Sequence, residues 1–133
     1  MTHFECQMAL NEKLDEYAKS KKIKIAYPNV NFKPDVARPW FKLFYLPTTS
    51  TDIGFGKNNE RIKGIMQVDI FIPRGRGTWD GYKYAEELQN VFGINTAIHT
   101  ENGVVRITEF NLDSFQEDDW FRIMVEIHYT SFN

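Results

Sequence analysis

The segment Arg74-Gly75-Arg76-Gly77-Thr78 carries the residue types best suited to hold an anion. It combines two guanidinium groups and two glycines with the start of an expected helix, and a helix N-terminus favours negative charge. The same residues also fit a structural role, in which the glycines turn a strand into a helix and the arginines face solvent. We expect Arg74 and Arg76 to bind protein carboxylates across a subunit or partner interface, with Glu117 and Asp118 of an adjacent copy as the first candidates.

The other residues with chemical potential lack the spacing that a catalytic or metal site needs. His3, His99 and His128 lie far apart in the sequence, and no two of them form an i,i+4 ligand pair. An acidic turn contains oxygen ligands that could hold a hard cation, namely Asp113, Glu117, Asp118 and Asp119. Their spacing follows no calcium-loop pattern, so a solvated turn is expected there. The sequence therefore predicts no metal site, no cofactor and no catalytic residue.

Two further patterns resemble reactive motifs without fulfilling them. The run Gly54-Phe55-Gly56-Lys57 lacks the earlier glycine of a phosphate-binding P-loop, and no Ser or Thr follows Lys57. Cys6 is the only cysteine, so an internal disulfide and a Cys-based zinc site are excluded. No histidine beside it in the sequence would activate its thiol. We expect a protein of a reducing compartment whose function is not nucleophilic catalysis.

Length and charge narrow the class of protein further. The chain has 133 residues, with 16 Lys and Arg against 18 Asp and Glu and a net charge of -2. A single domain over residues 1–133 can bury about two-thirds of its unfolded surface without disulfides or metals. The near-zero charge argues against a dedicated nucleic-acid binder. No apolar stretch is long enough to span a membrane.

The first third of the chain predicts a helix followed by an extended segment. Apolar residues recur at helical spacing over residues 3–20, which indicates an N-terminal helix within residues 1–20. The lysines of residues 19–24 complement the dipole at its C-terminus, with a nucleic-acid patch as the alternative. Residues 26–34 contain two prolines and cannot be helical. We expect an extended arm there, held by Tyr27 and Phe32.

Two strands, residues 40–46 and 61–72, are expected to form an antiparallel hairpin around a long loop at residues 47–60. Loops of this length are usually functional or disordered. We therefore expect Gly54, Phe55 and Lys57 to contact a neighbouring subunit or another partner. Trp40 and Phe41 point to opposite sides of the first strand, so both of its faces need cover.

The second half of the chain predicts a helix and three strands. The helix runs from an N-cap at Thr78 to a terminator at Gly93, and Asn102-Gly103 is typical of a type I′ hairpin. The final strand covers residues 119–130. The expected fold is α+β, with a mostly antiparallel sheet of about five strands, two helices packed on one face and the order α-β-β-α-β-β-β.

The sheet face opposite the helices is the expected interface. Trp40, Trp120 and Met124 lie on strand faces that two helices cannot cover in a domain of this size. Exposed apolar surface of this kind commonly mediates contact between subunits.

Several segments together resemble the phage tail terminator-like proteins of siphophages. The resemblance spans most of the chain after the first helix and rests on the order and spacing of these segments. They are Tyr27-Pro28-Asn29-Val30-Asn31-Phe32-Lys33-Pro34, the aromatic strand at residues 40–46, Gly64-Ile65-Met66-Gln67-Val68-Asp69-Ile70-Phe71-Ile72-Pro73 with Gly75, Gly77 and Thr78, the helix end at residues 85–92, and Gln116-Glu117-Asp118 before Trp120-Phe121-Arg122, Val125, Ile127 and Tyr129.

The resemblance implies a structural protein without catalytic residues. Such terminators form rings, expected to be hexamers, that bind the last ring of the tail tube, stop its polymerisation and present a surface to the head-tail connector. The implied location is the head-proximal end of the virion tail, after assembly in the host cytoplasm, with DNA passing through the lumen without specific binding and no membrane contact. The loop at residues 47–60 would then contact the tube or a neighbouring subunit. The alternatives are another head-tail connector or minor tail component, and a small anion-binding domain or enzyme that uses residues 74–78.

Overall fold

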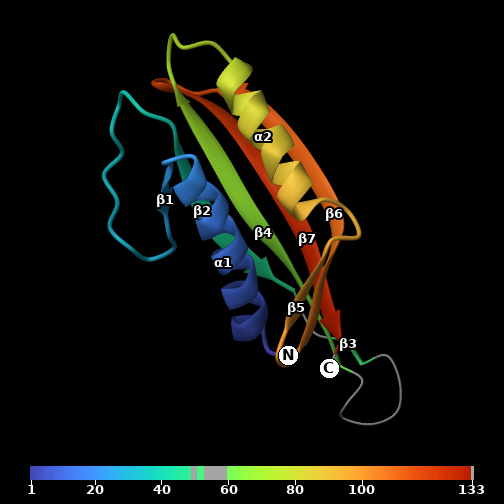
Figure 1. The fold of residues 1–133 in the computed structure, drawn as a ribbon. Helices are drawn as coiled ribbons and strands as arrows, with labels where there is room; N and C mark the ends of the chain where they lie inside the picture. Colours follow the sequence, from blue (N-terminus) through green and yellow to red (C-terminus); the bar gives the residue numbers. More distant parts are fainter. Residues whose placement is uncertain (49–50, 53–59, 133) are drawn as a thin grey trace.

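Two helices pack on one face of a twisted sheet in the computed structural model, which describes residues 1–48, 51–52 and 60–132 (Figure 1). The α+β class and the two helices on one face are as the sequence predicts. The elements in chain order are α1 (His3–Ser20), β1 (Lys24–Ala26), β2 (Trp40–Pro47), β3 (Thr51–Asp52), β4 (Glu60–Pro73), α2 (Trp79–Phe92), β5 (Ala97–Thr100), β6 (Gly103–Gln116) and β7 (Trp120–Phe132).

The strands form one sheet in the order β1-β2-β4-β7-β6-β5, with the short β3 paired to β4. Every pairing is antiparallel except that of β1 with β2. The expected hairpin is confirmed, because β2 pairs with β4 from Trp40 opposite Phe71 to Pro47 opposite Gly64. The expected number of strands and their order need correction: the described residues form seven strands, and β1 and β3 are the additions.

Strand β1 exists because the chain reverses sharply after α1. Lys22 adopts φ of 58°, and the amide of Ile23 donates to the carbonyl of Ala18 at 2.9 Å, a pattern that closes a helix C-terminus. The following residues then run parallel to the start of β2, with Ile25 opposite Phe41. This pairing places Ile23 and Ala26 in buried positions, which favours the strand over a free arm.

The core lies between the helices and the sheet face that they cover. Helix α1 begins with a capping box between Thr2 and Glu5, and helix α2 starts after Thr78 without a side-chain cap bond. The core side chains recur at helical spacing on the helices and at strand spacing on the strands, and residues 66–73 of β4 are buried on both faces of the sheet. The largest fully buried side chains are Tyr129, Phe41, Phe92, Leu10, Leu14, Leu43, Met66, Ile70, Ile72, Leu88, Ile107 and Ile123.

The structure differs from two predictions made for glycines, the helix terminator Gly93 and the type I′ turn at Asn102-Gly103. Gly93 ends α2 with φ of -69°, outside the left-handed region, and a Cβ there would clash with the carbonyl oxygen of Gln89 at 2.6 Å. Thr100 pairs with Gly103, so the two residues of the β5–β6 turn are Glu101 and Asn102. Neither has positive φ, so the turn is not type I′.

The turn expected around Glu117 and Asp118 lies between the end of β6 at Gln116 and the start of β7 at Trp120. Within the expected loop at residues 47–60, Thr51 and Asp52 pair with Arg61 and Glu60. Gly54, Phe55 and Lys57 lie outside the described residues. Within the parts of the chain that the structure covers, neither helix is long and apolar enough to cross a membrane.

Candidate assembly interface

The sheet face opposite the helices, here named the open face, carries the three apolar residues singled out from the sequence. Because side chains alternate along a strand, the neighbours of core residues on β2, β4 and β7 all point to this side. Register places Trp40 opposite Phe71, and Asp69 opposite Met124. Trp40, Trp120 and Met124 are each half-buried, so the open face keeps apolar surface accessible to a partner.

Four rings form an aromatic cluster at one end of the open face: Phe32, Trp40, Phe71 and Trp120. Trp40 stacks on Phe71 with ring centroids 4.2 Å apart and an interplanar angle of 6°. Trp120 meets the Trp40 ring edge-on at 5.8 Å. Phe32 comes from the segment between β1 and β2 and lies 5.1 Å from Trp40. The expected anchoring of this segment by Phe32 is therefore confirmed, and Trp40 and Trp120 belong to the same cluster.

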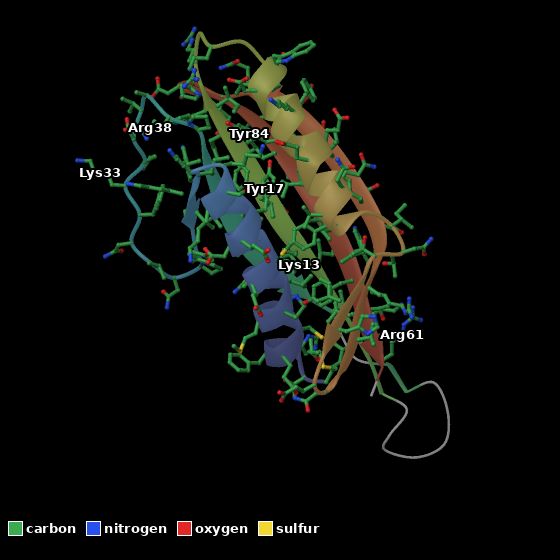
Figure 2. The ribbon with its side chains drawn as sticks, viewed as in Figure 1. Lys13, Tyr17, Lys33, Arg38, Arg61 and Tyr84 are labelled. Atoms are coloured by element: carbon green, nitrogen blue, oxygen red, sulfur yellow. The ribbon has the colours of Figure 1, made fainter. Side chains whose placement is uncertain are left out.

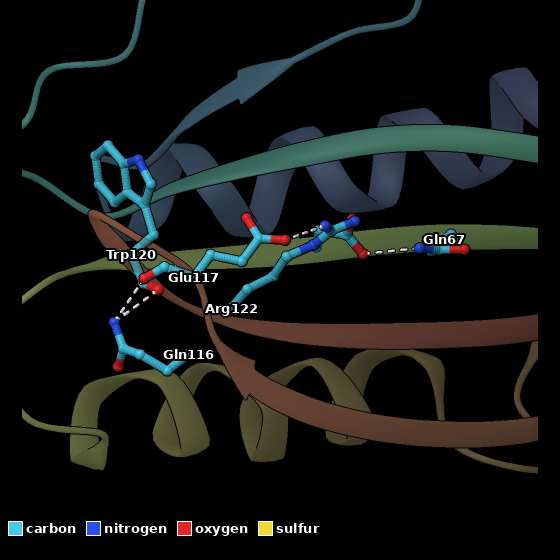
Figure 3. A network of polar contacts seen from close by, with 6 residues as sticks. Gln67, Gln116, Glu117, Trp120 and Arg122 are labelled. Atoms are coloured by element: carbon cyan, nitrogen blue, oxygen red, sulfur yellow. Dashed lines mark hydrogen bonds and ion pairs between the residues drawn. The ribbon is translucent and has the colours of Figure 1, made fainter.

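Beside the aromatic cluster, Asp69 and Arg122 form an ion pair at the centre of the open face (Figure 3). Asp69 is completely buried, and its Oδ2 accepts hydrogen bonds from Arg122 Nε at 3.1 Å and Arg122 Nη2 at 2.5 Å. Gln67 Nε2 donates to the other carboxylate oxygen at 2.9 Å. Arg122 Nη1 reaches Glu117 at 2.8 Å. One guanidinium group thus links β4, β7 and the β6–β7 turn.

Arg122 also covers part of the apolar surface. Its guanidinium carbon lies 5.4 Å from the ring centroid of Phe71 and 5.2 Å from that of Phe115, within cation–π range. Phe71 is 6% exposed, so the monomer buries this ring by itself. The expectation of a bare apolar face is thus too simple. Arg122 and the aromatic cluster cover the centre of the open face. The apolar surface that stays accessible belongs to the half-buried Trp40, Trp120 and Met124.

The two arginines of the β4–α2 turn have partners within their own chain. Arg74 Nη1 donates to the carbonyl oxygen of Asp118 at 3.0 Å, and the amide of Arg74 donates to the carbonyl oxygen of Asp119 at 2.9 Å. Arg76 Nη1 donates to the carbonyl of Ala37 at 3.0 Å, and its Nη2 lies 3.8 Å from Asp80. The fold therefore places Arg74 beside the acidic turn, where it binds main-chain carbonyl oxygens and not the carboxylates. Carboxylate pairing between copies remains a prediction.

The described residues show no assembled metal site and no activated thiol. They contain no group of three or more His, Cys, Asp or Glu side chains placed to hold a metal ion. Cys6 is buried against the sheet, and burial raises the pKa of its thiol. A buried, protonated thiol is a poor nucleophile. The hollow beside Arg74, Gly75 and Thr78 is about 430 Å³ in volume, and both arginine side chains of this turn already donate to protein oxygens.

The sequence profile of the phage tail terminator protein family matches residues 5–129, almost the whole of the chain. The chain belongs to this family. The terminator-family protein is accordingly a structural protein of the phage tail, which associates with other tail or head components and resides in the tail of the virion.

A solved structure of a protein of similar length superposes on this terminator-family chain with a TM-score of 0.81. The two sequences are 20% identical, and the superposition covers 98% of this chain and 96% of the solved one. At this identity the likeness establishes the fold alone. No curated protein sequence matches the chain.

Sequence reasoning missed the ion pair between Asp69 and Arg122. Strand alternation places both residues on the open face, yet their contact depends on which strands are neighbours. Opposite charges on one face of adjacent strands are the signal that could have paired them. Phe71 and Phe115 were missed for the same reason, since only the β4–β7 and β6–β7 registers bring their rings to Arg122.

Proposed function

We propose that this terminator-family protein forms a ring, with six copies as the expected number, that caps the tail tube. In this role it stops tube polymerisation and provides the surface that joins the head. A ring results when one surface patch binds a different patch on the next copy and the rotation closes. A capped end no longer offers the tube's own binding surface, so growth stops.

The observation that carries the proposal is the open face. It presents half-buried Trp40, Trp120 and Met124 on a sheet whose other face is filled by two helices. Burying a large apolar side chain lowers the free energy by about 1.5–3 kcal/mol, so contact with another protein over this surface would be favourable. The Asp69–Arg122 pair fixes the positions of the surrounding side chains, so the surface is ordered before it binds.

The partners in this proposal are further copies of the chain, the tail tube protein and the head-tail connector or head-completion protein. The cap sits at the head-proximal end of the tail after assembly in the host cytoplasm. DNA passes through the lumen without specific binding. Gly54, Phe55 and Lys57, which the structure does not describe, are proposed as contacts to the tube or to a neighbouring copy.

Another connector or minor tail component is the second candidate function, since the fold does not fix the position in the tail. A small anion-binding domain is disfavoured by the hydrogen bonds from Arg74 and Arg76 to main-chain carbonyls. Each bond directs the guanidinium group toward an oxygen atom of its own chain.

Size-exclusion chromatography with light scattering tests the ring directly. Six copies of the 15.7 kDa chain give a mass near 94 kDa, whether in free solution or after release from purified tails. A protein that stays at the monomer mass in solution and is absent from purified tails would contradict the proposal. A dodecamer or a pentamer would correct the number of copies and leave the ring intact.

A further inference from the structure

Among the described residues, part of strand β6 has no partner strand on one side. Strand β5 pairs only with residues 103–106, and the main-chain bonds between Ile107 and Asn95 or Thr96 extend the cover by one residue. From residue 108 to residue 116 the strand is paired with β7 on one side alone. Leu112 and Phe115 on this stretch are 47% and 37% exposed. Unpaired edges with exposed apolar side chains are places where another chain can bind.

This edge is strongly acidic. Residues 108–119 contain five Asp and Glu side chains and no Lys, Arg or His. Glu117 is bound by Arg122, whereas the other four acidic residues are exposed. We call these four the acidic edge: Glu109, Asp113, Asp118 and Asp119.

The opposite edge of the same sheet is basic. It consists of β1, the arm, defined as residues 27–39, and the flanking residues Lys22 and Lys42. Figure 2 shows Lys33 and Arg38 on the arm at the side remote from β6. Residues 21–42 contain six Lys and Arg side chains and one Asp. Lys21 and Arg38 have acidic partners at 2.9 and 3.9 Å. The remaining four lysines, all exposed and without an ion pair among the described residues, form the basic edge: Lys22, Lys24, Lys33 and Lys42.

The arm offers more than charge to a partner. Val30 and Val36 are 62% and 77% exposed, so apolar side chains accompany the lysines just as Leu112 and Phe115 accompany the acidic edge. Apolar contact flanked by charges is the usual composition of a protein interface. The net charge of the chain is thus near zero although its two sheet edges carry opposite charges.

We propose that the acidic edge of one copy binds the basic edge and arm of the next copy. The two surfaces lie on opposite edges of one sheet, so the contact is head-to-tail, and an open assembly has one free acidic edge and one free basic edge at its two ends until the ring closes. This inference rests on the proposed ring and names the surfaces that would build it. A second copy fits better than DNA because DNA would leave the acidic edge without a role.

Charge reversal with rescue tests the pairing in the full-length protein. The acidic-edge variant carries Glu109→Lys and Asp113→Lys, and the basic-edge variant carries Lys24→Glu and Lys33→Glu. The expected result by light scattering is that each variant alone falls from the ring mass to the monomer mass. An equimolar mixture should recover the ring mass, because the two reversed edges attract each other.

Matched control variants change the same charges on exposed helix positions. Glu12→Lys with Glu86→Lys, and Lys13→Glu with Lys83→Glu, should keep the ring mass. Far-UV circular dichroism verifies that all four variants are folded. If the edge variants keep the ring mass, or if both edge and control variants lose it and the mixture recovers nothing, the edge pairing is wrong.

Zero-length carbodiimide cross-linking of the wild-type protein gives a second test that needs no variant. A ring assembled from copies with and without nitrogen-15 should give mixed-isotope links from Lys24 or Lys33 to Glu109 or Asp113. A wild-type ring whose cross-links all lie on other surfaces would overturn the edge pairing and leave the proposed ring standing. A wild-type protein that forms no ring in solution or on tails overturns both.

Discussion

Arg122 on β7 and Asp69 on β4 form an ion pair in which the carboxylate is completely buried and the guanidinium is 21% exposed. A buried carboxylate without a partner is costly, because its hydration is lost and nothing replaces it. The pair therefore fixes the strand that carries Trp120 relative to the strand that carries Phe71. Through these contacts the open face holds one arrangement of its aromatic side chains.

Arg122→Ala should destabilise the protein by about 3–5 kcal/mol, because it leaves Asp69 charged, buried and unpaired. Urea unfolding followed by circular dichroism measures the loss. Adding Asp69→Asn to the same chain should restore most of the stability. Glu117→Gln is the control, expected to cost less than about 1 kcal/mol since Glu117 is partly exposed. Equal losses in the single and double variants would show that packing, and not charge, explains the effect.

Gly64→Ala should destabilise the sheet by about 1–3 kcal/mol or more, since a Cβ at this position would overlap the ring of Tyr129. That ring is 1% exposed and lies in the core, so it has little room to move. Thermal unfolding measures the effect, and Lys63→Ala at the exposed neighbouring position serves as the control. A Gly64→Ala protein with the wild-type midpoint would show that the tyrosine shifts without cost.

The sequence is sufficient for the elements that depend on local pattern. Helical spacing of Leu10 and Leu14 predicts α1, and strict alternation predicts the face of each residue on β4 and β7. The β2–β4 hairpin follows from two strands close in the chain. Local pattern and short-range pairing can therefore be predicted from the order of the residues alone.

The missed features depend on contacts between distant segments. Strand β1 is hidden in a run of lysines, and only its position beside β2 makes Ile25 a strand residue. The Asp69–Arg122 pair spans 53 positions in the chain, and the sequence does not show that β4 and β7 are neighbours. The charged edges become visible only from the strand order, which places β1 at one end of the path and β6, covered by β5 over residues 103–106, next to the other end.

Four buried or half-buried tyrosines, Tyr17, Tyr27, Tyr45 and Tyr129, should titrate late in alkali. Burial, aided by the hydrogen bond that its hydroxyl donates to Asp15, raises the pKa of Tyr27 to about 12. Burial also raises the pKa of Tyr129 to about 12, and those of Tyr17 and Tyr45 further. Because these values exceed the unfolded value near 10, the stability they contribute is complete below about pH 10.

That contribution is lost as the pH rises from about 10 through 12. Urea midpoints should therefore fall between pH 9 and pH 11, and absorbance at 295 nm should show a titration delayed until the protein unfolds. Ionisation of Tyr17, Tyr27, Tyr45 and Tyr129 near pH 10 in a folded protein would contradict the burial of these side chains.

Met124→Glu and Trp120→Ala should lower the oligomeric state while leaving the far-UV circular dichroism largely unchanged. Both side chains are half-buried on the open face, outside the core between helices and sheet. Trp40→Ala differs, because its ring stacks on Phe71 at 4.2 Å and its loss should also reduce stability. If Met124→Glu unfolds the isolated monomer, this part of the open face belongs to the core, and the assembly surface must be sought on the helices.

The length of tails assembled without this protein tests the proposed capping role most directly. Phage that lack the protein are compared by electron microscopy with phage supplied with the wild-type chain from a plasmid. The account predicts tubes of irregular, extended length without heads in the first case, and tails of uniform length joined to heads in the second. Tails of normal length joined to heads in the absence of the protein would contradict the account.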